Sequence, residues 1–146
     1  MARVPWEITR EMFLSVEETD ALLAHIRMET ESRGTTGFLD RLIIETLLYS
    51  GLRNSEFCRL RLTDAHLDST ESTLTVVGAG EQRIVHIPRE ISKLLSQFVS
   101  DVRPGLLPPG AGLDDPDQPL ILHERHRPFE RTGLYRRVVR ILTAAG

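Results

Sequence analysis

Residues 50–62 read SGLRNSEFCRLRL, and this short stretch decides how the surrounding chain is divided into helices. Gly51 is typical of the residue that ends a helix, and the Asn-Ser pair at 54–55 is typical of a helix start. The sequence therefore predicts one helix up to Gly51, a link made of Leu52 and Arg53, and a new short helix. An arginine in so short a link is either ordinary surface charge or a positioned anion ligand.

Two helices are predicted before this link. In LSVEETDALLAHIRME, residues 14–29, Ser15 and Glu18 have capping-box spacing and are followed by apolar residues at helical intervals. This first helix is expected to end near Gly34. GFLDRLIIETLLYSG, residues 37–51, predicts a second, mostly buried helix from about Phe38 to Ser50.

The periodicity changes after the link. In STLTVVGAGEQRIVHIP, residues 72–88, two β-branched runs, Leu74–Val77 and Ile84–Ile87, flank a glycine-rich turn and predict a hairpin. A helix is then expected after Pro88, with one apolar stripe. That stripe consists of Ile91, Leu94, Leu95, Phe98 and Val102.

The last third begins with a predicted loop, because five of the eight prolines fall between Pro104 and Pro119. LILH, residues 120–123, is interpreted as a short strand, and FERTGLYRRVVRILTAAG, residues 129–146, as a final helix. Its inward-facing residues are expected to be Leu134, Val138, Ile141 and Leu142. The predicted class is α+β, mainly helical, with a small antiparallel sheet of a hairpin plus one strand.

The composition indicates a single globular domain. A chain of 146 residues with 40% hydrophobic side chains has enough apolar content for a core. No apolar run approaches the roughly 20 residues of a membrane span, and MARVPWEITREMF, residues 1–13, lacks the apolar region of a signal peptide. The only cysteine, Cys58, excludes an internal disulfide and fits a cytoplasmic protein; a buried structural thiol is favoured over a nucleophile.

The charge is distributed unevenly. Residues 1–122 carry 12 basic and 19 acidic side chains, whereas residues 123–146 carry 6 and 2. The arginines of this basic end form either a solvated face or a set of contacts to a phosphate backbone. Arg136, Arg137 and Arg140 are expected on the side of the last helix opposite its apolar stripe, and Arg125, Arg127 and Arg131 precede or open that helix.

Three segments together resemble the catalytic domain of the tyrosine recombinases, the phage-integrase family that includes Xer-type enzymes. They are TLLYSGLRNSEFCRLRLTDAHLD at 46–68, LTVVGAGEQRIVHIP at 74–88 and PLILHERHRPFERTGLYRRVVRILTAAG at 119–146. The first is the most specific, since the family shows T-G-L-R-x-S-E-L-x-x-L-x-W-x-D there. The residues in register are Gly51, Leu52, Arg53, Ser55, Glu56, Leu60 and Asp64.

The resemblance implies that Arg53 is the first catalytic arginine, which binds the scissile phosphate of double-stranded DNA. In this family a tyrosine attacks the phosphodiester and forms a 3′-phosphotyrosyl link without a metal or nucleotide cofactor. Glu56 is then expected to support the helix junction, where it could pair with a neighbouring arginine or cap the helix. DNA-backbone contacts are expected from Arg83, Arg127, Arg131, Arg136 and Arg137.

The chain departs from the family pattern in three ways. Ala79 stands where the family has a lysine that protonates the leaving hydroxyl, and Arg83 in the same turn is a poor replacement acid. The family's histidine-x-x-arginine box and nucleophilic tyrosine are expected beyond Gly146. Third, the N-terminal domain with which the family clamps DNA is not expected in this chain. Residues 1–12 resemble a remnant of the linker that follows that domain, and residues 13–146 resemble a partial catalytic domain.

Several patterns have a plainer interpretation. HIPR, residues 86–89, has the histidine-x-x-arginine spacing but lies far upstream of that box, so a chance match is favoured. Tyr135 is expected to be a packing or DNA-backbone contact rather than a nucleophile. His123 and His126 lack an evident third ligand, so no metal site is predicted.

Two function hypotheses follow. The first is a DNA-binding recombinase-like domain of integration and site-specific recombination that does not cleave DNA alone. The alternative is a non-catalytic protein-interaction module or degenerate remnant, which the acidic balance of residues 1–122 favours. Self-association is expected in either case, because a partial domain exposes apolar surface. The coding DNA beyond Gly146 would distinguish a fragment from a complete protein.

Overall fold

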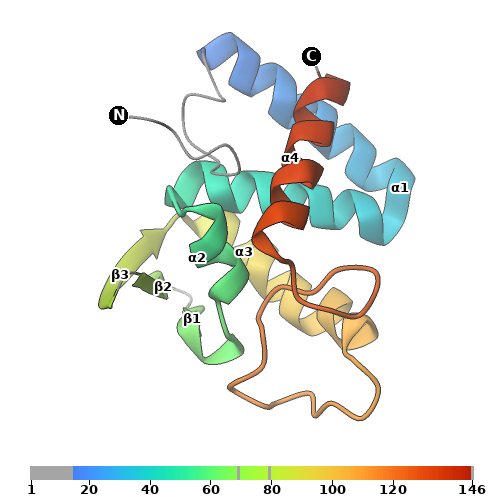
Figure 1. Ribbon diagram of the computed structural model, residues 1–146. Coiled ribbons are helices and arrows are strands. Elements are labelled where there is room, and N and C mark those ends of the chain that lie inside the picture. The colour runs from blue at the N-terminus through green and yellow to red at the C-terminus, as the bar shows by residue number, and fades with distance from the viewer. Residues whose placement is uncertain (1–14, 69, 79, 146) are drawn as a thin grey trace. The chain divides into compact units, whose positions relative to one another are not determined.

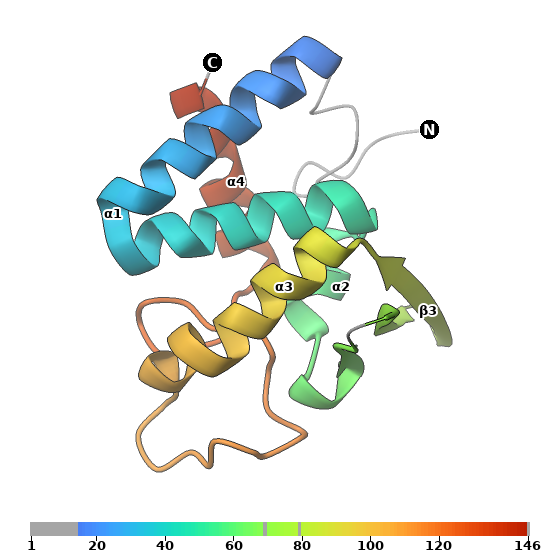
Figure 2. The same ribbon diagram turned by 180° about the vertical axis from the view of Figure 1, so that it is seen from behind.

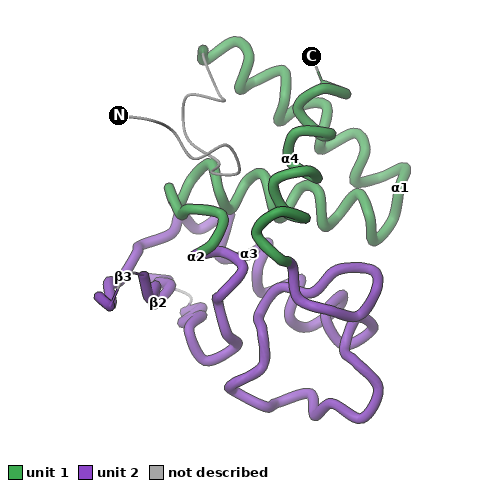
Figure 3. The backbone as a smooth tube through the Cα atoms, in the orientation of Figure 1, with its two compact units in different colours: residues 1–55, 130–146 green, residues 56–129 purple. Residues whose placement is uncertain are grey.

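The computed structural model describes residues 15–68, 70–78 and 80–145. The predicted linker at 1–12 and Ala79 lie outside these residues. The chain divides into two compact units (Figure 3). Unit 1 comprises residues up to Ser55 and from Glu130 onward, and unit 2 comprises Glu56–Phe129.

Helix α1 (Val16–Ser50) contains both helices predicted before the link. Ser15 caps it, since the Ser15 hydroxyl accepts from the Glu18 N–H at 3.0 Å. The helical conformation is interrupted at Gly34, whose φ of 59° and ψ of −131° suit glycine alone. Figures 1 and 2 show α1 as two limbs that turn back on each other at this point, so the predicted division at Gly34 is confirmed.

Helix α4 (Arg131–Ala145) packs against α1 in unit 1 (Figures 1 and 2). Leu134, Val138 and Ile141 are buried as expected, whereas Leu142 is only half-buried. The apolar core of unit 1 is completed by residues of α1 and the link. These are Leu22, Leu23, Ile26, Phe38, Leu39, Leu42, Ile43, Ile44, Leu47 and Leu52.

Unit 2 contains a three-stranded antiparallel sheet in the order β1-β2-β3. Strands β2 (Ser72–Gly78) and β3 (Glu81–Ile87) form the predicted hairpin, with Ser72 opposite Ile87 and Gly78 opposite Glu81. Gly80 in the turn has a φ of 83°, which explains why glycine is needed there. The third strand, β1 (Ala65–His66), pairs with β2.

Helix α3 (Arg89–Gln97) follows Pro88 as predicted and continues into a wider turn, η3 (Phe98–Val102), and a tighter one, η4 (Arg103–Leu106). Of its predicted stripe, Ile91, Leu94, Leu95 and Phe98 are buried, and Val102 is half-buried. Arg103 is buried, and desolvation lowers its pKa. It donates to the carbonyls of Pro119 at 2.7 Å and Leu120 at 3.0 Å, which holds the far end of the proline-rich loop.

The strand predicted at 120–123 is wrong. Leu120, Ile121 and Leu122 are buried, but their segment forms only isolated bridges, one of them between Leu122 and Pro128. The Leu120 N–H donates to the Leu60 carbonyl at 2.8 Å and the Leu120 carbonyl accepts from Arg103, so these backbone groups join no ladder. The α+β class is nevertheless confirmed, because β1 completes the sheet.

Short segment η2 (Leu62–Asp64) leads from α2 into β1. It is anchored by the returning loop, since the Leu62 N–H donates to the Gln118 carbonyl at 2.9 Å and the Thr63 N–H to that of Pro116 at 3.0 Å. Within the described ranges, no helix is both long enough and apolar enough to cross a bilayer.

Candidate nucleic-acid interface

The link between α1 and α2 (Asn54–Arg59) has the predicted length. Gly51 ends α1 with a φ of 70°, and its N–H donates to the Leu47 carbonyl at 3.1 Å. Leu52 and Asn54 are 2% and 1% exposed, while Arg53 between them is exposed. Buried neighbours on both sides therefore fix the backbone that carries the Arg53 side chain.

Asn54 connects this link to the start of α4. Its side-chain amide nitrogen lies 3.4 Å from the Arg131 carbonyl, and its side-chain oxygen accepts from the Ser55 N–H at 2.9 Å. Because that N–H is already bonded and α2 has only six residues, the helix N-terminus contributes little to anion binding. An anion bound at this link would be held chiefly by the Arg53 guanidinium.

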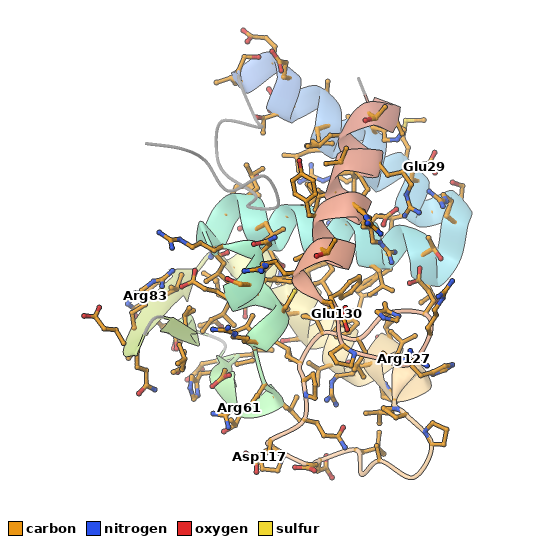
Figure 4. The ribbon with its side chains drawn as sticks, viewed as in Figure 1. Glu29, Arg61, Arg83, Asp117, Arg127 and Glu130 are labelled. Carbon is orange, nitrogen blue, oxygen red and sulfur yellow. The ribbon has the colours of Figure 1, made fainter. Side chains whose placement is uncertain are left out.

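Glu56 lies in the first turn of α2 and pairs with an arginine, one of the two arrangements left open by the sequence. Its partner is Arg83 on β3 (Figure 4), whose Nη2 donates to Glu56 Oε1 at 3.0 Å and whose Nη1 donates to Oε2. The Glu56 side chain is 7% exposed and that of Arg83 50%. These hydrogen bonds to Glu56 raise the pKa of Arg83, so the guanidinium stays charged.

Arg137 does not lie where the sequence analysis placed it. Its side chain is 10% exposed, and Nε donates to Asp40 Oδ1 at 2.7 Å while Nη2 lies 3.3 Å from the Thr36 carbonyl. The predicted face was wrong because position 137 is three residues from Leu134 and four from Ile141, both buried. The DNA contact of Arg137 stays a prediction, and its guanidinium is already bound to a buried carboxylate.

The remaining predicted contacts are more accessible. Arg131 and Arg136 are exposed on α4, and Arg127 is exposed on the loop that precedes it in the chain (Figure 4). Exposed guanidinium groups suit contacts to a phosphate backbone. These three side chains meet that requirement individually.

The histidines of this loop have structural contacts. His123 Nδ1 accepts from the Arg125 N–H at 3.0 Å, and its ring packs edge-on against Phe129 at 5.1 Å. His126 occupies the left-handed region with a φ of 63°. Over residues 15–68, 70–78 and 80–145, no group of three His, Cys, Asp or Glu side chains is arranged to hold a metal.

Three other features noted in the sequence lie in regular helices or strands. His86 of the HIPR segment ends β3, where its Nδ1 lies 3.1 Å from Glu71 Oε1. Tyr49 in α1 is exposed and Tyr135 in α4 is half-buried. Cys58 is half-buried, whereas a buried structural thiol was favoured from the sequence.

Sequence reasoning missed the side chains that hold these candidates in place. Asn54 was noted only as a helix-start signal, although its position just before Ser55 also permits a bond to the backbone N–H. Asp40 was hidden in an apolar helix, and an acid in an otherwise buried run is the signal that would have indicated an ion pair. Gly78 was assigned to the turn, whereas it is the residue next to the Glu56 carboxylate.

Residues 12–146 match the phage integrase family. The chain belongs to that family. Two relatives of this integrase chain are tyrosine recombinases XerD: that of Lacticaseibacillus casei is 34% identical over 95 residues, and that of Listeria innocua serovar 6a 26% over 97. These matches cover 64% and 66% of this chain but 30% and 31% of the relatives, so the chain spans about a third of their length.

Solved structures resemble the integrase chain in fold. The XerA recombinase matches with a TM-score of 0.66 and 23% identity over 91% of this chain and 42% of its own. XerH bound to palindromic difH substrate in a post-cleavage complex matches with a TM-score of 0.71 and 24% identity, over 91% of this chain and 35% of its own. XerH in the pre-cleavage complex with difH gives the same score and identity, over 91% and 36%. At these identities the likeness shows the recombinase catalytic-domain fold.

Proposed function

We propose that this member of the tyrosine recombinase family binds duplex DNA and that Arg53 is its ligand for the scissile phosphate. The observation that carries the proposal is the placement of Arg53, exposed in a two-residue link between two nearly fully buried neighbours. The same link belongs to the segment that matches the family's most specific motif. A side chain on so constrained a backbone loses less freedom when it binds.

The chemistry of arginine supports this role. A guanidinium presents a planar fork of donors that fits two phosphate oxygens at once and stays charged at any ordinary pH. Donors already in place when charge develops on a phosphorane lower the barrier of phosphoryl transfer. Arg53 would therefore stabilise both the bound phosphate and the transition state.

We propose that Arg127, Arg131 and Arg136 add contacts to the DNA backbone. Each is exposed, and each lies in the part of the chain with an excess of basic residues. With Arg53 they make four candidate phosphate contacts. Counterion release then gives a slope of log affinity against log salt of about −3 to −4, at about −0.9 per contact.

We also propose that a polypeptide of these 146 residues does not form a covalent link to DNA unaided. Its two tyrosines, Tyr49 and Tyr135, lie inside helices α1 and α4. Its only lysine, Lys93, lies in α3 rather than in the β2–β3 turn. These features favour DNA binding without strand cleavage.

The proposal is tested by titrating fluorescent duplex DNA with the protein at several salt concentrations. Binding that weakens along the slope given above supports it, and no binding at low salt rejects it. Incubation with a nicked suicide substrate, followed by a denaturing gel, tests the second part. A protein–DNA adduct abolished in a tyrosine-to-phenylalanine variant would overturn the proposed lack of cleavage.

A second candidate function is a protein-interaction module that keeps the recombinase fold. It is favoured by the acidic balance of residues 1–122 and by the arginines already engaged in ion pairs. A flat DNA titration together with a stable protein complex would select this candidate. Self-association also stays a prediction, which sedimentation at increasing protein concentration would check.

A further inference from the structure

The Glu56–Arg83 pair suggests a different role for Arg83 from the DNA contact expected at first. In the hairpin Arg83 is opposite Val76, so both side chains project from the same face of the sheet. Val76 is buried, and Arg83 therefore extends from the packed face toward Glu56 rather than from the outer face. Two of its nitrogens donate to the two oxygens of one carboxylate.

This arrangement satisfies the charge of a buried acid. Glu56 is almost fully buried, and an unpaired carboxylate in such a position is strongly unfavourable. If Arg83 turned toward a phosphate, it would leave Glu56 without this partner. The bidentate pair therefore opposes any use of Arg83 as a direct phosphate ligand.

Gly78 at the end of β2 completes the arrangement. A Cβ atom at this position would lie 2.9 Å from Glu56 Oε2, so the carboxylate would have to shift from its present place. The absence of a side chain thus lets the carboxylate lie directly against the hairpin backbone. Glu56 contacts the hairpin on both sides of its turn, at Gly78 on β2 and at Arg83 on β3.

We propose that Glu56, Arg83 and Gly78 form a clamp that fixes the β2–β3 turn to the start of unit 2, and that Arg83 is a positioning residue rather than a DNA contact. The inference rests on the proposed function, since the turn matters for DNA only if the chain binds DNA. The clamp acts by limiting the motion of Gly78 and of residues 80–83. It adds no net charge to the surface, because the cation and the carboxylate neutralise each other.

The first test needs no DNA. Amide hydrogen exchange of residues 76–84 is measured in the wild-type protein, Glu56→Gln, Arg83→Gln and the double variant, with Arg127→Gln as a matched control. Each single variant should lose protection by roughly tenfold or more, and the double variant no more than either one, because one shared interaction is removed. Unchanged protection in the two single variants would overturn the clamp.

The second test separates positioning from direct contact. Arg127→Gln should reduce the salt slope of DNA binding by about 0.9, because one phosphate contact is lost. Arg83→Gln should weaken binding at every salt concentration and leave the slope unchanged. A slope reduced by about 0.9 in Arg83→Gln would make Arg83 a phosphate contact, and unchanged affinity would reject its positioning role. If the wild-type protein binds no DNA, the proposed function fails while the exchange experiment still decides the clamp.

Discussion

The substitution Gly37→Ala tests how the two limbs of α1 are held together. A Cβ atom at Gly37 would lie 2.4 Å from the Glu29 carbonyl oxygen and 2.9 Å from Thr30 Cα, on the other side of the break at Gly34. These are backbone atoms, so rotation of a side chain cannot relieve the overlap. The Thr30 hydroxyl also lies 2.8 Å from the Ile26 carbonyl and 3.3 Å from that of Gly37. The contact with Gly37 joins the two limbs at the same place.

Overpacking a tight site costs about 1–3 kcal/mol and occasionally more, and the approach at Gly37 is at the severe end. Alanine would recover about 0.4–1 kcal/mol by restricting the unfolded chain. We therefore expect a net loss of about 2–3 kcal/mol, or a fall in Tm of roughly 4–12 °C for a domain of this size. Urea unfolding followed by circular dichroism measures the loss of free energy directly.

The matched control is Gly133→Ala in α4, where an added Cβ would meet nothing within 4 Å and φ is not positive. Alanine is a better helix former than glycine, so this variant should be as stable as the wild-type protein or more stable. If Gly37→Ala were no less stable than Gly133→Ala, the close crossing of the two limbs would be refuted.

Two further predictions concern buried charges. Asp40→Asn should lower the free energy of unfolding by about 3 kcal/mol, because it removes the carboxylate that pairs with the nearly buried Arg137. A loss below about 1 kcal/mol in urea unfolding would contradict this prediction. Arg103→Met should release the loop end at Pro119 and Leu120 and speed proteolysis between Leu107 and Pro119, whereas Lys93→Met on the exposed side of α3 should not; equal cleavage rates in both variants would remove the anchoring role of Arg103.

Local signals in the sequence predicted the junctions of this fold well. Gly34 and Gly51 each end a helical limb because a positive φ is needed there, and the hairpin turn at Gly80 follows the same rule. Such requirements act on single residues and are visible without tertiary contacts. The helix start at Asn54 and the cap at Ser15 are local in the same sense.

Features that depend on tertiary contacts were predicted less well. Leu120–Leu122 is apolar enough for a strand, but Leu60 and Arg103 bind the Leu120 backbone instead. The two-residue strand β1 has no β-branched residue and forms only because β2 lies beside it. Likewise, Arg137 was assigned to the exposed face because nothing in the local sequence indicates Asp40, 97 residues earlier.

In the candidate site, too, local features were predicted and tertiary contacts were not. Arg53 was predicted as a phosphate ligand from the motif around it, and it is exposed between two buried neighbours. The partner of Glu56 was left open, because only the folded hairpin brings Arg83 to it. The Glu56–Arg83 pair thus depends on the tertiary fold, because its two residues lie 27 positions apart.

The affinity of Arg53→Ala for duplex DNA tests the central claim most directly. Its matched control is Arg59→Ala, which removes an exposed arginine from the last turn of α2. Loss of a charged contact of about 1.5–3 kcal/mol predicts binding weakened roughly 10- to 150-fold in Arg53→Ala, with the salt slope reduced by about 0.9, in a variant that circular dichroism shows to be folded. Arg59→Ala should bind within about twofold of the wild-type protein. Equal affinities of the two variants would contradict the assignment of Arg53 as the phosphate ligand.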